Sequence, residues 1–262
     1  MNKKVVGKIG KSSKKVIHHK KERAIIRLKN VYKYYFMGED VTIKAVDGID
    51  IDVYEGDFVS IMGPSGSGKT TSMNLVGSLD VPTEGAIYLD GEDISTLTES
   101  ELAELRGQKI GFIFQQFNLI PNLTAKENVT LPMTFQGVSA TERDEIAEEL
   151  LEKVGLGERM NFYPNQLSGG QQQRVAIARA LANDPEVILA DEPTGNLDTK
   201  TGDKVMDFLE KLNKEGKTII LVTHDPELAK KHSYKVYHLR DGKVEKITKN
   251  KASEKFLNKP HK

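Results

Sequence analysis

The chain has 262 residues, of which 38% are hydrophobic and 29% charged, and its formal net charge is +0. This length accommodates one large α/β domain or two smaller lobes, and the neutral balance argues against a general nucleic-acid-binding protein. The chain contains no cysteine, which excludes disulfides, thiolate zinc sites, iron–sulfur clusters and cysteine nucleophiles. No apolar run approaches the roughly 20 residues needed to span a bilayer.

Two basic segments flank the patterned part of the chain. Residues 1–23 and 248–262 are rich in lysine, and the first lacks the apolar core of a secretory signal. We expect both to be flexible tails, with a weak contact to anionic lipid head groups or nucleic acid as the alternative. The domain itself is predicted to occupy residues 24–247.

Short apolar runs alternate with helical patterns between the tails. Strands are predicted at residues 57–62, 110–114, 187–190 and 218–222, and helices at residues 69–79 and 200–213. This alternation predicts a parallel sheet covered by helices. Residues 41–53 and 235–247 have the pattern of β-hairpins, the second turning at Asp241-Gly242.

A mainly helical lobe is predicted from residue 97 to about residue 170. Three capping-box patterns mark helix starts there: Thr98…Glu101, Thr124…Glu127 and Ser139…Glu142. One apolar helical face is formed by Ile146, Leu150, Leu151 and Val154, with Gly155 as the cap that follows. We expect this lobe to be inserted into the α/β part.

The segment GPSGSGKT at residues 63–70 matches the pattern G-x-x-x-x-G-K-[ST] between a predicted strand and a predicted helix. Its glycines allow backbone N–H groups to point at phosphate oxygens, and the helix N-terminus adds a positive dipole. Lys69 supplies a positive charge to the outer phosphates, and Thr70 offers a hydroxyl ligand to Mg²⁺. A plain glycine-rich turn is the competing interpretation, but the flanking strand and helix favour phosphate binding.

Two acids, Asp191 and Glu192, directly follow the apolar run at residues 187–190. Asp191 could hold Mg²⁺, and Glu192 could orient or deprotonate a water that attacks the γ-phosphate. A helix-capping pair of acids is the alternative interpretation. His224 and Gln115 also end strands, and either could reach a nucleotide only if its strand flanks the phosphate loop.

The sequence LSGGQ at residues 167–171 precedes a helical run. Its serine and two glycines could form a second anion site at a helix N-terminus. Because Ser168 and Gln171 also fit a capping box, the segment taken alone favours ordinary capping.

Taken in order, these motifs resemble the nucleotide-binding domain of ABC transporters. The series is GPSGSGKT (63–70), Gln115, LSGGQ (167–171), VILADEP (187–193), GNLD (195–198) and TH (223–224). LSGGQ separates this family from kinases, GTPases and other P-loop proteins. The resemblance implies an α/β fold: a P-loop ATPase with a RecA-like parallel-sheet core, an antiparallel β subdomain and an inserted α-helical subdomain.

The resemblance also implies a head-to-tail homodimer with ATP between the phosphate loop of one copy and LSGGQ of the other. The implied catalytic residues are Glu192, His224 as the γ-phosphate sensor, Gln115 and Lys69, and the implied Mg²⁺ residues are Thr70, Gln115 and Asp191. The implied nucleotide-binding residues are Tyr35, Gly63, Pro64, Ser65, Gly66, Ser67, Gly68, Lys69, Thr70, Thr71, Ser168, Gly169, Gly170, Gln171 and Asp198, the last linking the two halves. Tyr35 would stack on adenine, with Tyr32 and Tyr34 as alternatives.

Residues 110–129, 164–185 and 190–202 resemble one branch in particular, the macrolide-exporter, lipoprotein-release and cell-division group. That likeness implies a cytoplasmic ATPase, peripheral on the inner face of the cell membrane, that drives an integral membrane permease on a separate chain. The permease would dock near residues 115–134, and the transported substrate would not touch this chain. Export, lipoprotein or peptide extrusion, or mechanotransmission would be the work done. The basic extension 1–23 is unusual for this group.

Two other functions compete with this one. A soluble ABC ATPase acting on nucleic acid or the ribosome is the alternative, but such proteins usually carry two cassettes, a long coiled-coil insertion or cysteine clusters, and nucleic acid is not an expected partner here. A regulatory module that closes on ATP without turnover conflicts with the intact Glu192.

Overall fold

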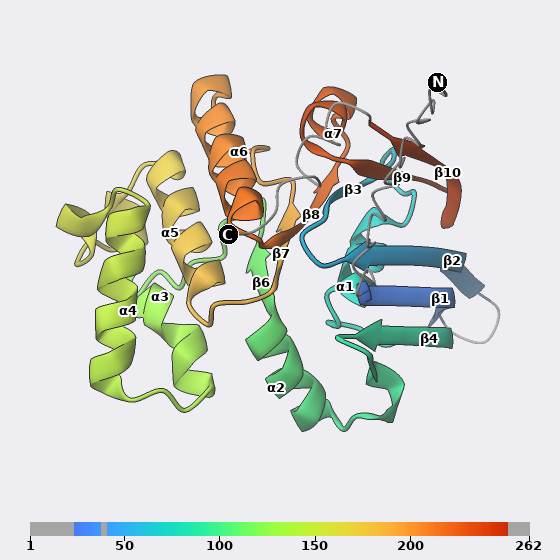
Figure 1. Ribbon diagram of the computed structural model, residues 1–262, viewed down its shortest axis with the longest axis horizontal. Helices are drawn as coiled ribbons and strands as arrows, with labels where there is room; N and C mark the ends of the chain where they lie inside the picture. The colour runs from blue at the N-terminus through green and yellow to red at the C-terminus, as the bar shows by residue number, and fades with distance from the viewer. Residues whose placement is uncertain (1–23, 38–40, 251–262) are drawn as a thin grey trace, which may run out of the picture.

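The fold is that of a computed structural model, in which residues 24–37 and 41–250 are described (Figure 1). An antiparallel sheet has the strand order β2-β1-β4-β5 and contains β1 (Ala24–Met37), β2 (Val41–Tyr54), β4 (Glu84–Leu89) and β5 (Glu92–Asp93). A larger sheet has the order β10-β9-β3-β8-β7-β6 and contains β3 (Phe58–Met62), β6 (Ile110–Ile113), β7 (Val187–Asp191), β8 (Thr218–Thr223), β9 (Lys235–Arg240) and β10 (Lys243–Lys249).

The larger sheet is parallel from β9 to β6, and only β10 runs antiparallel to its neighbour. Seven α-helices accompany the sheets in the described residues: α1 (Lys69–Val76), α2 (Glu99–Lys109), α3 (Ala125–Phe135), α4 (Ala140–Lys153), α5 (Gly169–Leu181), α6 (Thr199–Lys214) and α7 (Pro226–His232). The predicted class, a parallel-sheet core with an antiparallel β subdomain and an inserted helical subdomain, is confirmed. None of the described helices has the length and apolar character to cross a bilayer.

Alternation along the parallel strands produces two hydrophobic cores, because successive side chains of a strand point to opposite faces of the sheet. In β8, Ile220 and Val222 pack with α1 and the antiparallel sheet. Ile219 and Leu221 pack with α3, α4, α5 and α6 on the other face. Figure 1 shows the helical lobe on the left and strands β1, β2 and β4 of the antiparallel sheet on the right.

Three predicted boundaries differ from the structure. Residues 41–53 are not a hairpin but part of the single strand β2, which pairs with β1; Gly48 (φ 77°) sits at an irregularity of that pairing. The predicted strand 110–114 lies inside the expected helical range 97–170, and β6 forms the edge of the parallel sheet. Thr248 and Lys249 belong to β10 rather than to a tail. The remaining tail residues, 1–23 and 251–262, lie outside the described residues.

Helix starts follow the capping patterns of the sequence. Thr98 and Thr124 each form a complete capping box with the glutamate three residues later. Ser139 accepts a hydrogen bond from the Glu142 backbone but forms only this half of the box. The predicted helix 69–79 is shorter than expected, since α1 ends at Val76.

Candidate nucleotide-binding site

Strand register brings the predicted site segments to one edge of the parallel sheet. Met62 at the end of β3 lies opposite Thr223 of β8, and Asp191 of β7 lies opposite Val222. The phosphate loop, Glu192 and His224 therefore leave three adjacent strands at the same level. This is the carboxyl edge of the sheet, where ligands of open α/β folds bind.

The loop between β3 and α1 depends on glycine at defined positions. Gly68, the residue before α1, has φ 93° and no side-chain cap, and a Cβ there would overlap the Ala45 carbonyl oxygen. Gly63 is similarly pressed against the Leu239 carbonyl. The first N–H groups of α1 thus have no side-chain acceptor within the motif and remain available to an anion.

The Lys69 side chain folds back over this loop. Its Nζ donates to the carbonyl oxygens of Gly63 (2.7 Å) and Pro64 (2.8 Å). These bonds hold the ammonium group at the mouth of the loop, where it can exchange carbonyl acceptors for phosphate oxygens.

Glu192 is held by three donors from the end of β8. The carboxylate accepts hydrogen bonds from the Thr223 hydroxyl (3.2 Å), the His224 backbone (2.8 Å) and His224 Nδ1 (2.6 Å). Its backbone is in the left-handed region (φ 44°), and its N–H donates to the Val222 carbonyl (2.9 Å). The Glu192 side chain is 16% exposed and that of His224 is 71% exposed, so a fixed carboxylate lies behind an accessible imidazole.

Asp191, at the end of β7, is more buried than a typical carboxylate. Burial, reinforced by the adjacent Glu192 charge and opposed by Lys69, raises the pKa of Asp191. Asp191 and Thr70, the latter in the first turn of α1, carry oxygen atoms, the ligand type that Mg²⁺ prefers. A cation here would also offset the repulsion between the two carboxylates.

Part of this site lines an open pocket of about 670 Å³, and Asp191 and Thr70 are not among its lining residues. Its lining consists of Met62, Gly63, Pro64, Ser65, Lys69, Glu192, His224 and Pro226. The phosphate loop, the carboxylate and the histidine predicted from the sequence are thus brought together.

The LSGGQ segment lies elsewhere, on the helical lobe. Ser168 caps α5 in a complete capping box with Gln171, so the capping interpretation of this motif is correct as local structure. A Cβ on Gly170 would come within 2.6 Å of a Thr201 methyl group on α6. Ser168 and its neighbours are not among the residues that line the pocket described above.

Two further predicted residues hold loops between these regions. Gln115, two residues after β6, accepts a hydrogen bond from Asn196 on its backbone carbonyl (2.8 Å), and its side chain lies against Gly195. Asp198 caps α6 by accepting bonds from the Thr201 backbone (3.1 Å) and hydroxyl (2.6 Å), which lower the pKa of Asp198.

Comparisons with known proteins assign the family. The family model described as ABC transporter matches residues 46–195. The chain belongs to the ABC transporter ATP-binding family. This cassette is 56% identical to the ABC transporter ATP-binding protein YknY of Bacillus subtilis, over 84% of this chain and 95% of YknY.

A solved structure shows the same fold. The dimeric post-hydrolysis structure of the ATP-binding cassette MJ0796, from Methanocaldococcus jannaschii, bound to ADP and Pi, matches with a TM-score of 0.79 and 52% identity, covering 86% of this chain and 98% of that one. The cassette is also 49% identical to the macrolide export ATP-binding/permease protein MacB of Hyphomonas neptunium, over 87% of this chain but only 35% of MacB. The cassette is accordingly an ATPase, and these relatives favour a transporter subunit over an ATPase of nucleic acid or the ribosome.

Tyr35 and the neighbouring tyrosines of the cassette contact different parts of the structure. The Tyr35 hydroxyl donates a hydrogen bond to Asp80, in the connection that leaves α1, and the residue is 39% exposed. Tyr32 and Tyr34 instead pack edge to face on each other, 5.9 Å apart. Tyr35 is therefore the tyrosine directed towards the phosphate-loop helix.

Sequence reasoning missed the roles of two residues that support the cassette's site. Thr223 belongs to a recognised motif, but the pattern does not predict its bond to Glu192. Arg179 of α5 donates to the Phe117 (2.8 Å) and Asn118 (2.5 Å) carbonyls and so fixes the loop after Gln115. Only the proximity of α5 to β6 in the fold reveals this contact, because 61 residues separate Arg179 from Asn118.

Proposed function

We propose that this cassette dimerises head to tail on ATP and drives an integral membrane permease encoded on another chain. The proposal rests on the observation that the two parts of the expected ATP site lie apart within one chain. The phosphate loop, Glu192 and His224 converge at the sheet edge, whereas the Ser168 helix tip stands on the helical lobe. A second copy related by two-fold symmetry can supply the missing half to each site.

In the proposed site, the phosphate loop and Lys69 hold the phosphates. Oxygen ligands from Thr70, Asp191 and Gln115 would hold Mg²⁺, which neutralises phosphate charge when bound. Glu192 orients the attacking water, and the Thr223 and His224 donors keep its carboxylate in place. His224 is exposed enough to report on the γ-phosphate.

The remaining nucleotide contacts come from the two ends of the site. Tyr35 receives the adenine, Ser168 to Gln171 act on the phosphates of the opposite copy, and Asp198 links the two halves. The capping bonds of Ser168 support this role because they fix the helix tip before a nucleotide arrives.

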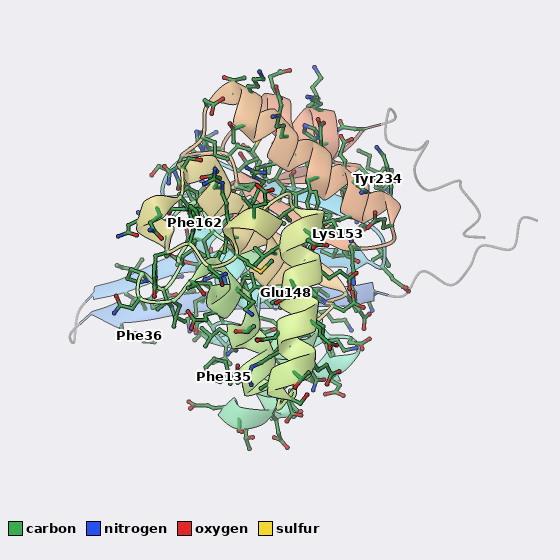
Figure 2. All side chains as sticks on the ribbon, turned by 90° about the vertical axis from the view of Figure 1, so that its left-hand side faces the viewer. Phe36, Phe135, Glu148, Lys153, Phe162 and Tyr234 are labelled. Carbon is green, nitrogen blue, oxygen red and sulfur yellow. The ribbon has the colours of Figure 1, made fainter. Side chains whose placement is uncertain are left out.

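The permease is proposed to dock beside the loop after Gln115. A second pocket of about 460 Å³ lies there, lined by Gln116, Phe117, Asn118, Leu119, Pro121, Pro164, Asn165, Gln172 and Asn196. Phe135, at the end of α3, is 79% exposed and is labelled on the helical lobe in Figure 2. A single exposed aromatic side chain is ordinary on a protein surface, so Phe135 is only an additional apolar contact in this proposal. The likeness to MacB supports export or extrusion and a position at the inner face of the membrane.

The catalytic assignment is tested with Glu192→Gln. We expect ATP hydrolysis to fall by about 100-fold or more, the scale of a general base, while ATP binding persists. Glu245→Gln, on β10, is the control and is expected to hydrolyse ATP like the parent. Hydrolysis by Glu192→Gln at the parent rate would contradict the assignment.

Copurification from native membranes tests the partner, which is expected to be an integral membrane protein.

A further inference from the structure

A small network of side chains surrounds Tyr35. Asp80 accepts the Tyr35 hydroxyl on Oδ2 (3.1 Å) and the Lys33 ammonium on Oδ1 (2.6 Å). Lys33 Nζ also lies over the Tyr35 ring, 5.3 Å from its centroid. The aromatic ring is therefore fixed at its hydroxyl end and covered by a cation on one face.

Asp80 is itself anchored to the helix of the phosphate loop. The backbone N–H groups of Leu79 and Asp80 donate to the Asn74 carbonyl of α1 (2.8 and 3.3 Å). Lys33 adds a bond to the Val81 carbonyl (2.9 Å). Through these bonds the connection after α1 is tied to the strand that carries Tyr35.

We propose that Asp80 is a positioning residue that, together with Lys33, holds the Tyr35 ring ready to receive the adenine of ATP on the face opposite Lys33. This inference rests on the proposed nucleotide role of Tyr35. Burial and the bond to Asp80 raise the pKa of Tyr35, which keeps its phenol a neutral donor to the carboxylate. A ring that is ordered before binding loses less conformational freedom when the base stacks on it.

The geometry also links the two ends of the nucleotide. Asp80 follows α1, whose first turn would contact the phosphates, and it bonds to the aromatic residue that would contact the base. Loss of Asp80 is expected to weaken recognition of the base while leaving phosphate binding intact. A merely structural role would weaken both.

The test compares ADP, which carries the base, with pyrophosphate, which does not. Both are titrated calorimetrically into the full-length protein. Asp80→Ala is expected to weaken ADP binding about fivefold and to leave pyrophosphate binding unchanged. Tyr35→Phe, which keeps the ring but loses the hydroxyl, is expected to weaken ADP binding by the same factor as Asp80→Ala. The double variant that carries both substitutions is expected to bind ADP no more weakly than either single variant.

The matched control is Asp52→Ala, which removes the ion pair between Asp52 and Arg27. Arg27 lies on β1, as Lys33 does, and the Arg27–Asp52 distance equals the Lys33–Asp80 distance of 2.6 Å. This variant is expected to bind both ligands like the parent. If Asp80→Ala does not fold, Asp80→Asn replaces it, with a smaller loss for ADP expected.

The outcomes separate this inference from the proposed function. If Tyr35→Ala weakens ADP binding but Asp80→Ala does not, the positioning role is wrong and the stacking role stands. Equal weakening of ADP and pyrophosphate by Asp80→Ala also overturns the positioning role. If Tyr35→Ala leaves ADP binding unchanged, the adenine contact itself is wrong, and if the parent binds neither ligand, the proposed function fails.

Discussion

The sheet edge and the Ser168 helix tip are built in opposite ways. At the sheet edge, three strands far apart in sequence deliver Lys69, Glu192 and His224 into one pocket. At the helix tip, a single short segment satisfies its own polar groups through a capping box. The first region is assembled by the fold, whereas the second is complete locally and gains a further role only when another molecule approaches it.

The largest expected effect comes from mixing two inactive variants. Lys69→Ala removes the cation of the phosphate loop, and Ser168→Arg blocks the helix tip, so each variant alone is expected to lose hydrolysis. In a mixture of equal parts, about half of the dimers are mixed and each contains one intact site, which predicts recovery of about a quarter of the parent rate. Absence of recovery in a hydrolysis assay would contradict sharing of the two regions between copies.

Gly68→Ala tests the backbone of the sheet edge. An alanine at φ 93° is strained, and its Cβ would overlap the Ala45 carbonyl, so we expect a loss of roughly 1–3 kcal/mol in unfolding free energy together with weaker ATP binding. Gly216→Ala is the matched control, because Gly216 has φ 106° but no atom within 4 Å of the position that a Cβ would take. Denaturant unfolding and ATP titration of both variants separate strain from overlap, and equal behaviour of the two would contradict the tight approach.

Thr223→Val tests the support of Glu192. Removal of one of three donors is expected to slow hydrolysis about fivefold, the equivalent of about 1 kcal/mol, and to leave ATP affinity unchanged. Steady-state kinetics distinguish these quantities, and an unchanged hydrolysis rate would show that the hydroxyl does not position the carboxylate. Thr248→Val, on β10, is the control for the substitution itself.

The smallest effect concerns Asp191 and pH. Because burial raises its pKa, the folded state binds this proton more tightly than the unfolded state, and stability declines as pH rises from the ordinary value of 3.8 through the raised one. Asp191→Asn removes that penalty and is expected to raise the melting temperature at neutral pH, measured without Mg²⁺ or nucleotide. Asp203→Asn, on the exposed face of α6, is expected to show no such gain, and an equal gain would contradict the burial argument.

Local motifs and contacts between distant segments differ in how far the sequence predicts them. The phosphate loop and LSGGQ are local patterns, so their strand, turn and helix contexts follow from adjacent residues. The adjacency of Glu192 to Thr223 and of Tyr35 to Asp80 depends on strand order and register, which span 31 and 45 residues. The prediction of a hairpin at residues 41–53 was wrong for the same reason, because alternation along β2 does not reveal that its partner is β1.

The most direct test of the shared site is the mass of Glu192→Gln measured by light scattering with Mg·ATP over a range of protein concentrations. A site shared between two copies predicts twice the monomer mass with ATP and the monomer mass without nucleotide. A protein that binds ATP yet keeps the monomer mass at every concentration would contradict it.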